Sequence, residues 1–254
     1  MKRSPKSGKN NWPPRWQGLW GAGVGKLKIP ACLALIVTLS VASPIRTHAA
    51  ATLTLYDGVN PLITVVDNGP GDLIGVTGAI LVHTNVGVWN LAVSTAITKP
   101  ILGSATDPIM DLDVQANSSA GGQLTLVFSD NGYGPAAGIL NAIVTGQIAS
   151  GAGATVTYDV YGDPSNVVGA TTVHIASAAN LTPLPLPPAG STGAGPLGLP
   201  TPFSLTQVET FIASGPTTLT SDASFSVIPE PSSMALTGLG LAACLLRVLR
   251  RNRS

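Results

Sequence analysis

The feature that most constrains the fold is an alternation of apolar and polar residues with a period of two, which recurs from Thr52 to Val227. In the segment 110–115 (MDLDVQ), Met, Leu and Val alternate with Asp, Asp and Gln, and 124–128 and 156–160 repeat the pattern. Successive side chains of a β-strand point to opposite faces, so this period predicts half-buried strands. Further candidate strands lie at 52–56, 62–67, 79–83, 86–94, 139–148, 166–176, 203–212 and 217–227.

Turn-forming sequences separate these candidate strands. Asp-Gly and Asn-Gly pairs stand at 57–58, 68–69 and 131–132, and Gly-Asp-Pro stands at 162–164. Such pairs mark reversals of chain direction between strands. About ten short strands without a convincing amphipathic helix predict an all-β body, an antiparallel β-sandwich of the immunoglobulin-like or jelly-roll type.

One stretch of this body, 181–202 (LTPLPLPPAGSTGAGPLGLPTP), departs from the alternation and is rich in proline and glycine. Proline cannot donate to a β-ladder, so the stretch cannot form a central strand. We expect a long exposed loop in extended conformation, or a linker before a last hairpin. The two candidate strands after it suit a closing pair of the same sheet, so we expect 50–226 to be one domain.

The charges are segregated along the chain in a way that the formal net charge of +1 conceals. Between Ala50 and Ile228 there are eleven acidic residues and one basic residue, Lys99, which gives a formal charge of −10 over 179 residues. Nucleic-acid binding needs clustered Lys and Arg, so we do not expect nucleic acid as a partner. Both cysteines, Cys32 and Cys244, lie outside this segment, which therefore has no internal disulfide or cysteine nucleophile.

The first 49 residues have the parts of a secretory signal peptide with an extended basic leader. Lys26 and Lys28 precede an apolar run at 29–41, and small residues then allow cleavage between Ala49 and Ala50. Such a peptide directs a chain to the export translocon, and the body is then expected outside the cell. Cleavage before Ala51 and a true start at Val24 remain alternatives.

The C-terminal end, 227–254, has three parts in a fixed order. Pro229, Glu230 and Pro231 come first, an apolar run follows at 234–246, and an arginine-rich tail ends the chain. Residues 232–249 would form a helix about 27 Å long, which is just enough to span a bilayer core. The terminal arginines should remain cytoplasmic by the positive-inside rule. The prolines hold the chain extended just before the expected transmembrane helix, where a processing enzyme can bind it.

This end resembles the PEP-CTERM sorting signal of Gram-negative bacteria, a tail that is also labelled after ice-binding proteins. The resemblance implies recognition of Pro229, Glu230 and Pro231 by an exosortase, a cysteine-type transpeptidase of the inner membrane. It implies an inner-membrane-anchored precursor and a secreted or cell-surface product, in organisms that make exopolysaccharide and biofilm. The alternative is a plain C-terminal membrane anchor.

The inventory of catalytic residues in the body is small. It has two histidines, His83 and His174, and both read as strand-face residues. No G-x-S-x-G, H-E-x-x-H, Walker A or C-x-x-C motif occurs in it. We therefore expect no enzyme and no catalytic residue. A Ser–His–Asp triad that uses one of the histidines is the remaining alternative, because folding can bring distant residues together.

We expect no resident metal or cofactor, and calcium is the one alternative that the sequence suggests. Asp111 and Asp113 project to one face of a strand, and Asp67 and Asp72 flank a turn. Calcium takes carboxylate oxygens of this kind from loops. The EF-hand pattern is absent, however, and Asp residues are also ordinary turn formers.

A carbohydrate-binding module is the alternative to a structural role. The candidate sugar-stacking rings are Trp89, Tyr133, Tyr158 and Tyr161, of which Trp89 suits the core better. The leading hypothesis is an exported, exosortase-processed, non-enzymatic structural or adhesive protein of the polysaccharide and biofilm matrix or the cell surface. Exopolysaccharide is its expected further partner, and a carbohydrate- or calcium-binding extracellular module is the alternative.

Overall fold

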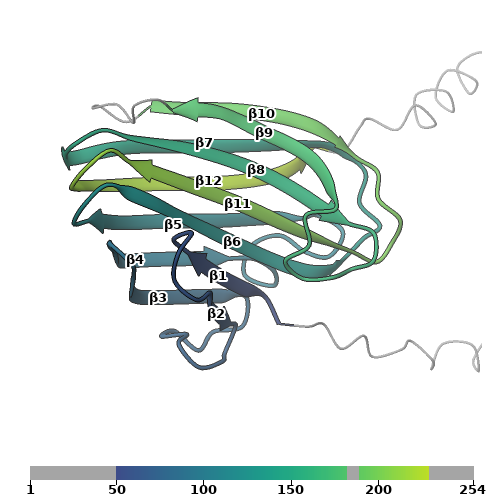
Figure 1. Ribbon diagram of the computed structural model, residues 1–254. Helices are drawn as coiled ribbons and strands as arrows, with labels where there is room; N and C mark the ends of the chain where they lie inside the picture. Colours follow the sequence, from purple (N-terminus) through teal and green to yellow (C-terminus); the bar gives the residue numbers. More distant parts are fainter. Residues whose placement is uncertain (1–49, 182–188, 229–254) are drawn as a thin grey trace, which may run out of the picture. The chain divides into compact units, whose positions relative to one another are not determined.

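The computed structural model describes residues 50–181 and 189–228 (Figure 1). The predicted signal peptide and the Pro-Glu-Pro motif with its transmembrane helix lie outside these residues and stay predictions. No helix in the described part of the chain has the length and apolar character that crossing a bilayer requires.

The body is built from strands, as the alternation predicts. In the described residues they are β1 (Thr52–Tyr56), β2 (Ile63–Val66), β3 (Ala79–Val86), β4 (Trp89–Ile97), β5 (Ile109–Ser118), β6 (Gly122–Tyr133), β7 (Gly138–Gly151), β8 (Ala154–Asp163), β9 (Val173–Leu181), β10 (Ala189–Leu197), β11 (Phe203–Ala213) and β12 (Thr217–Ile228).

These strands form two antiparallel six-stranded sheets that face each other (Figure 1). Sheet A has the order β2-β1-β6-β11-β8-β9, and sheet B has the order β10-β7-β12-β5-β4-β3. Within them, β5 to β12 are arranged as β6-β11-β8-β9 and β5-β12-β7-β10, which is the order of a jelly roll. The predicted β-sandwich is confirmed, and of its two expected types the structure has the jelly roll.

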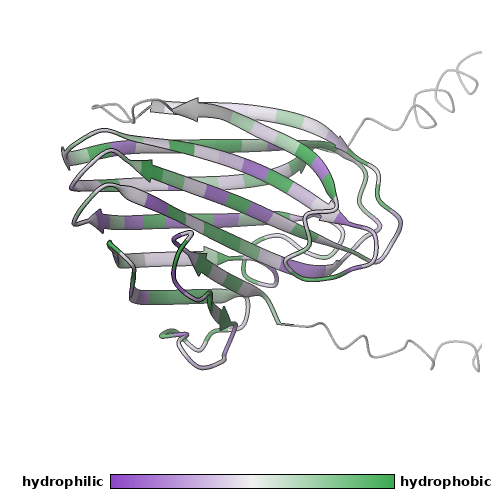
Figure 2. Ribbon diagram, in the orientation of Figure 1, coloured by the Kyte–Doolittle hydropathy of each residue, from purple (hydrophilic) through white to green (hydrophobic). Residues whose placement is uncertain are grey.

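The core lies between the sheets and consists of the apolar half of each alternating strand. Met110, Leu112 and Val114 of β5 are fully buried, whereas Asp113 and Gln115 are exposed. Figure 2 shows hydrophobic and hydrophilic residues following one another along the strands. Aromatic rings link the two layers, since Trp89 of β4 lies 6.3 Å from Phe211 of β11 between ring centroids. Full burial of each large apolar side chain contributes about 1.5–3 kcal/mol, so this shared face holds the sheets together.

The proline- and glycine-rich stretch corrects one prediction. The segment 181–202 is not a loop throughout, because it contains β10, which pairs with β7 at the edge of sheet B. Glycine explains the difference. A Cβ on Gly193 would lie 1.7 Å from the carbonyl oxygen of Ser177 in β9, and a Cβ on Gly195 would lie 1.7 Å from that of Ile175. Small residues therefore let the edge strands of the two sheets approach closely, and an edge position tolerates Pro196.

Candidate functional site

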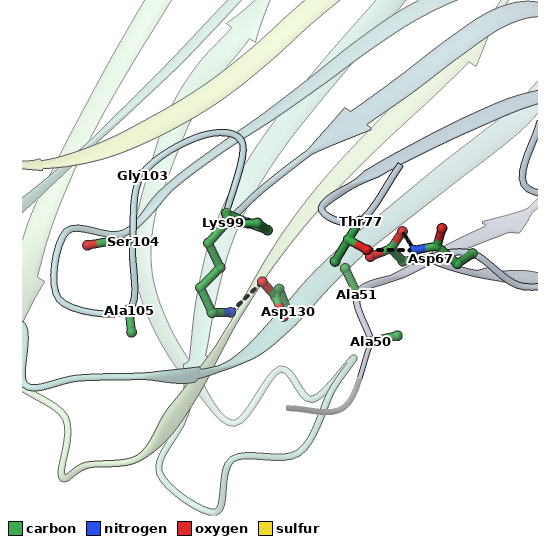
Figure 3. Close-up of a pocket in the computed structure, with 11 residues that line it drawn as sticks. Ala50, Ala51, Asp67, Thr77, Lys99, Gly103, Ser104, Ala105 and Asp130 are labelled. Carbon is green, nitrogen blue, oxygen red and sulfur yellow. Dashed lines mark hydrogen bonds and ion pairs between the residues drawn. The ribbon is translucent and has the colours of Figure 1, made fainter. Parts of the chain in front are cut away.

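A pocket of about 680 Å³ lies at one end of the sandwich. Figure 3 shows the side chains that line it. The segment just before β1, the β2–β3 loop, the β4–β5 loop and the end of β6 surround it. The residues on which its chemistry depends are Ala50, Asp67, Thr77, Lys99, Ser104 and Asp130. They come from segments far apart in the sequence, so the sandwich topology assembles the pocket.

A buried ion pair forms one wall of the pocket. Lys99 Nζ donates to Asp130 Oδ2 at 2.5 Å and to the carbonyl oxygen of Asn131 at 2.6 Å. Its side chain is 11% exposed and that of Asp130 is 5% exposed. The ammonium group also lies 3.9 Å from the centroid of the Tyr133 ring. Burial lowers the pKa of Lys99, and the charge of Asp130 and its hydrogen bond oppose that shift. The only basic residue between Ala50 and Ile228 is thus part of this pocket.

Neighbouring donors hold the Asp130 carboxylate in place. The hydroxyl of Thr98 donates to Oδ2 at 2.9 Å, and the backbone N–H of Asn131 donates to Oδ1 at 2.7 Å. The Tyr133 hydroxyl lies 3.3 Å from Oδ2 and 2.6 Å from Thr98 Oγ1. A buried charge is stable only when it is paired and hydrogen-bonded, and Asp130 meets both conditions.

The second carboxylate of the pocket, Asp67, organises the β2–β3 loop. Its side chain accepts hydrogen bonds from the backbone N–H of Gly78 and the side-chain amide of Asn68, both at 2.8 Å. Burial raises the pKa of Asp67, and the charges of Asp72 and Asp130 raise it further.

The predicted calcium ligands are placed in two separate parts of the body. Asp72 accepts backbone hydrogen bonds from the loop, among them that of Asn68 at 2.9 Å. Like Asp67, it uses its oxygens to shape the loop. Asp111 and Asp113 lie on the outer face of sheet B, where Asp222 of β12 stands opposite Asp113. Among the described residues, no three His, Cys, Asp or Glu side chains are arranged to hold a metal ion. Calcium binding stays an untested alternative.

The acidic face of sheet B lies over a carboxyl group in the core. Burial raises the pKa of Asp111 to about 6, and the adjacent Asp222 and Asp113 add to this effect. Inside the sandwich, Glu209 of β11 is fully buried and accepts a hydrogen bond from the Ser221 hydroxyl. Its other oxygen, Oε2, has no hydrogen-bond partner among the described residues. Burial raises the pKa of Glu209 to about 8, so the group is largely protonated at neutral pH.

Glu209 is not among the residues predicted from the sequence, although the sequence contains a signal for it. The inward-facing positions of β11 alternate as Leu205, Gln207, Glu209 and Phe211, so the register alone places the carboxyl group in the core. Gln207 shares this polar layer, because its Oε1 accepts a hydrogen bond from the Tyr158 hydroxyl at 2.7 Å.

A second polar cluster brings Ser177, His174 and Asp159 together on the outer face of sheet A. His174 Nε2 lies 3.1 Å from Asp159 Oδ1 and 2.8 Å from Ser177 Oγ, and the Ser177 hydroxyl donates to the same Asp159 oxygen. A catalytic triad needs the carboxylate on Nδ1 and the nucleophile on Nε2 of the histidine. Here one nitrogen meets both groups, so the cluster lacks the proton-relay arrangement. The other histidine, His83, is exposed on β3.

Three of the four candidate sugar-stacking rings are inaccessible. Tyr133 and Tyr158 are buried in the core, which corrects their assignment as stacking rings, and Trp89 is buried there as its sequence setting suggested. Alternation alone could not separate them from surface aromatics, because an aromatic ring suits either face of a strand. Tyr161 is partly exposed and packs edge-on against His174, with 5.2 Å between ring centroids.

Three solved structures show limited likeness to this body. A carbohydrate-binding module, TmCBM61 in complex with β-1,4-galactotriose, is 9% identical, with 56% of this chain and 88% of that chain covered and a TM-score of 0.28. A structure of carbohydrate-binding modules with promiscuous specificity, from the β-sandwich superfamily, is 13% identical, with 71% and 84% covered and a TM-score of 0.28.

The third structure is the enzymatically active domain of tailspike protein 4 of bacteriophage CBA120. It is 11% identical, with 64% of this chain and 21% of that chain covered and a TM-score of 0.29. Likenesses at this level carry no information about a ligand of this chain. No curated protein sequence matches the chain.

The two sheets define the body as that of an all-β sandwich protein. Residues 227–251 match the PEP-CTERM protein-sorting motif. The chain therefore carries a PEP-CTERM sorting signal, which implies export, processing by an exosortase and a secreted or cell-surface product.

Proposed function

We propose that this protein is a non-enzymatic adhesive or structural component of the extracellular polysaccharide matrix or cell surface, and that its body binds a neutral polysaccharide in the pocket at the end of the sandwich. The sorting motif supports a location outside the cell. The observation that carries the binding proposal is the pocket itself. Its volume of about 680 Å³ falls within the range of roughly 300–1,000 Å³ that is usual for ligand sites.

The chemistry of the pocket suits a polyhydroxylated ligand. Sugar hydroxyl groups both donate and accept hydrogen bonds, and they bind best to polar groups that are already held in position. Asp130 and Asp67 supply fixed acceptors, and Lys99 supplies a donor whose position is set by two hydrogen bonds. Ala50 and Pro100 add apolar wall against which the C–H groups of a sugar ring would pack.

The charge of the body favours a neutral polymer over an acidic one. The segment Ala50–Ile228 carries a formal charge of −10, and the pocket holds two carboxylates against one ammonium group. An anionic polymer would meet like charge both over the whole surface and at the site.

A non-enzymatic role is supported by the geometry of the one Ser–His–Asp cluster among the described residues. Its three side chains meet on an outer sheet face, and both partners of His174 contact the same nitrogen. An adhesive protein needs no nucleophile, since its task is to hold a polymer rather than to cleave it.

The test is to fill the pocket without touching its charges. Thr77 is exposed at the pocket lining, and Thr192 is exposed on β10, outside that lining. Thr77→Trp should weaken binding of the exported protein to the neutral polysaccharides of its host at least about tenfold, or 1.4 kcal/mol, whereas the matched variant Thr192→Trp should bind like wild type. Calorimetry with isolated polysaccharide, after a glycan-array screen, gives the affinities. Equal affinity in both variants would place the site elsewhere.

A further inference from the structure

The pocket holds more negative than positive charge. Lys99 supplies the one ammonium group, and it is already hydrogen-bonded to Asp130. The donors to Asp67 are the backbone N–H of Gly78 and the amide of Asn68, which are both neutral. Asp67 is only 7% exposed. A buried carboxylate with neutral partners is stabilised when a cation lies next to it.

The beginning of the body lies against the loop that carries this carboxylate. Ala50 and Ala51 line the same pocket as Asp67 (Figure 3). The carbonyl oxygen of Ala51 accepts a hydrogen bond from the backbone N–H of Asp67 at 2.9 Å. This bond fixes the first residues of the body against the β2–β3 loop. Cleavage before Ala50 would free an α-amino group here, and its ordinary pKa of about 7.7–8.0 keeps it largely charged at pH 7.

We propose that the α-ammonium group freed at Ala50 by signal-peptide cleavage is a resident cation of this pocket, bound by the Asp67 carboxylate. Asp130 and Lys99 also line the pocket, so the ammonium group would face a second carboxylate and one like charge. The inference rests on cleavage at this bond, and it requires no bound polysaccharide. In the precursor, residue 50 has a neutral amide N–H in place of the charge. Signal-peptide cleavage therefore adds a charged donor to the pocket, and a ligand can bind to this α-ammonium group only in the mature protein.

The test moves the new amino group by two residues. Inserting Ala-Ser directly before Ala50 keeps the residues that precede the cleavage site and displaces the α-ammonium group from Asp67. In the wild-type exported protein, an NMR titration should give an α-amino pKa about one unit above its ordinary 7.7–8.0, and the insertion should restore the ordinary value. The wild type should also melt at the higher temperature at pH 7. Because the folded pKa is raised, this advantage is complete below about pH 7.7 and is lost as the pH rises through the raised value.

Two substitutions locate the partner of the amino group. Asp67→Asn should abolish the differences in α-amino pKa and in melting temperature between the wild-type and inserted forms. Asp107→Asn removes an exposed carboxyl group that does not line the pocket, and it should leave both differences unchanged. If Asp67→Asn does not fold, the NMR comparison of the wild-type and inserted forms decides. An α-amino pKa in the ordinary range, or an exported chain that begins at another residue, overturns the proposal. Both results are independent of whether the pocket binds polysaccharide.

Discussion

Replacing Glu209 by Gln should make the stability of this protein much less sensitive to pH. Glu209 is fully buried, and burial raises its pKa to about 8. In the unfolded chain the same group titrates near its ordinary value of about 4.3. Between these two values the folded protein keeps a proton that the unfolded chain has released. The unfolded state therefore binds fewer protons, and the free energy of unfolding falls as the pH rises from about 4.3 to about 8.

The size of this effect follows from the separation of the two pKa values. Each unit corresponds to about 1.4 kcal/mol, so the wild type should lose on the order of 4 kcal/mol by pH 7 and 5 kcal/mol by pH 8 relative to pH 4. Gln has the same shape and no proton to lose. Its oxygen can accept the hydrogen bond from Ser221, and its amide nitrogen replaces the oxygen that has no partner. The stability of Glu209→Gln should match that of wild type near pH 4 and exceed it increasingly above that pH.

Urea unfolding of the exported protein at several pH values between 4 and 9 measures this difference. The matched control is Asp107→Asn, which removes an exposed carboxyl group. Asp111 also has a raised pKa, of about 6, so its titration makes the free energy of unfolding depend on pH in both proteins. The decisive quantity is therefore the difference in the free energy of unfolding between wild type and Glu209→Gln at each pH. Parallel curves for the two proteins would show that Glu209 is not held protonated in the core.

Three further predictions concern the edge strand, the acidic face and the sorting signal. Gly193→Ala should destabilise the protein by about 1–3 kcal/mol, because its Cβ would overlap a backbone oxygen of β9. The control Gly198→Ala has open space at its Cβ and should melt like wild type in a thermal melting experiment. Monovalent salt should raise the melting temperature by screening the acidic body, and calcium should add nothing beyond its ionic strength; a calcium-specific rise that Asp111→Ala with Asp113→Ala abolishes would contradict this. Alanine at all three positions 229–231 should trap the precursor in the inner membrane, and cell fractionation would detect normal release if the sorting assignment were wrong.

Local patterns in the sequence predicted much of the sandwich. The alternation in 110–115 identified the buried face of β5, because a half-buried strand places an apolar residue at every second position. The choice of jelly roll over immunoglobulin-like fold depends on long-range pairing, such as that of β5 with β12, which no local pattern encodes. The strand β10 was missed because its composition suits a loop, and the close approach of β9 that makes its glycines necessary appears only in the folded chain.

The candidate site was less predictable than the fold. The isolation of Lys99 in an acidic body was visible in the sequence, but its partner Asp130 lies 31 residues away and meets it through the sandwich. Asp67 was identified as a carboxylate of interest and assigned to calcium, whereas the structure places it in the wall of the pocket. Pairing of distant charged groups depends on tertiary structure, and sequence spacing does not reveal it.

The intact mass and N-terminal sequence of the exported protein from its native host test the central claim most directly. We expect a chain that begins at Ala50 and lacks the apolar run 234–246, because exosortase processing removes the sorting signal and that run would be costly to expose to water. A mass above the unmodified chain would reveal a covalently attached group. An exported product that begins at Met1 or Val24, or that retains the apolar run, would contradict the claim that this is a processed surface or matrix protein.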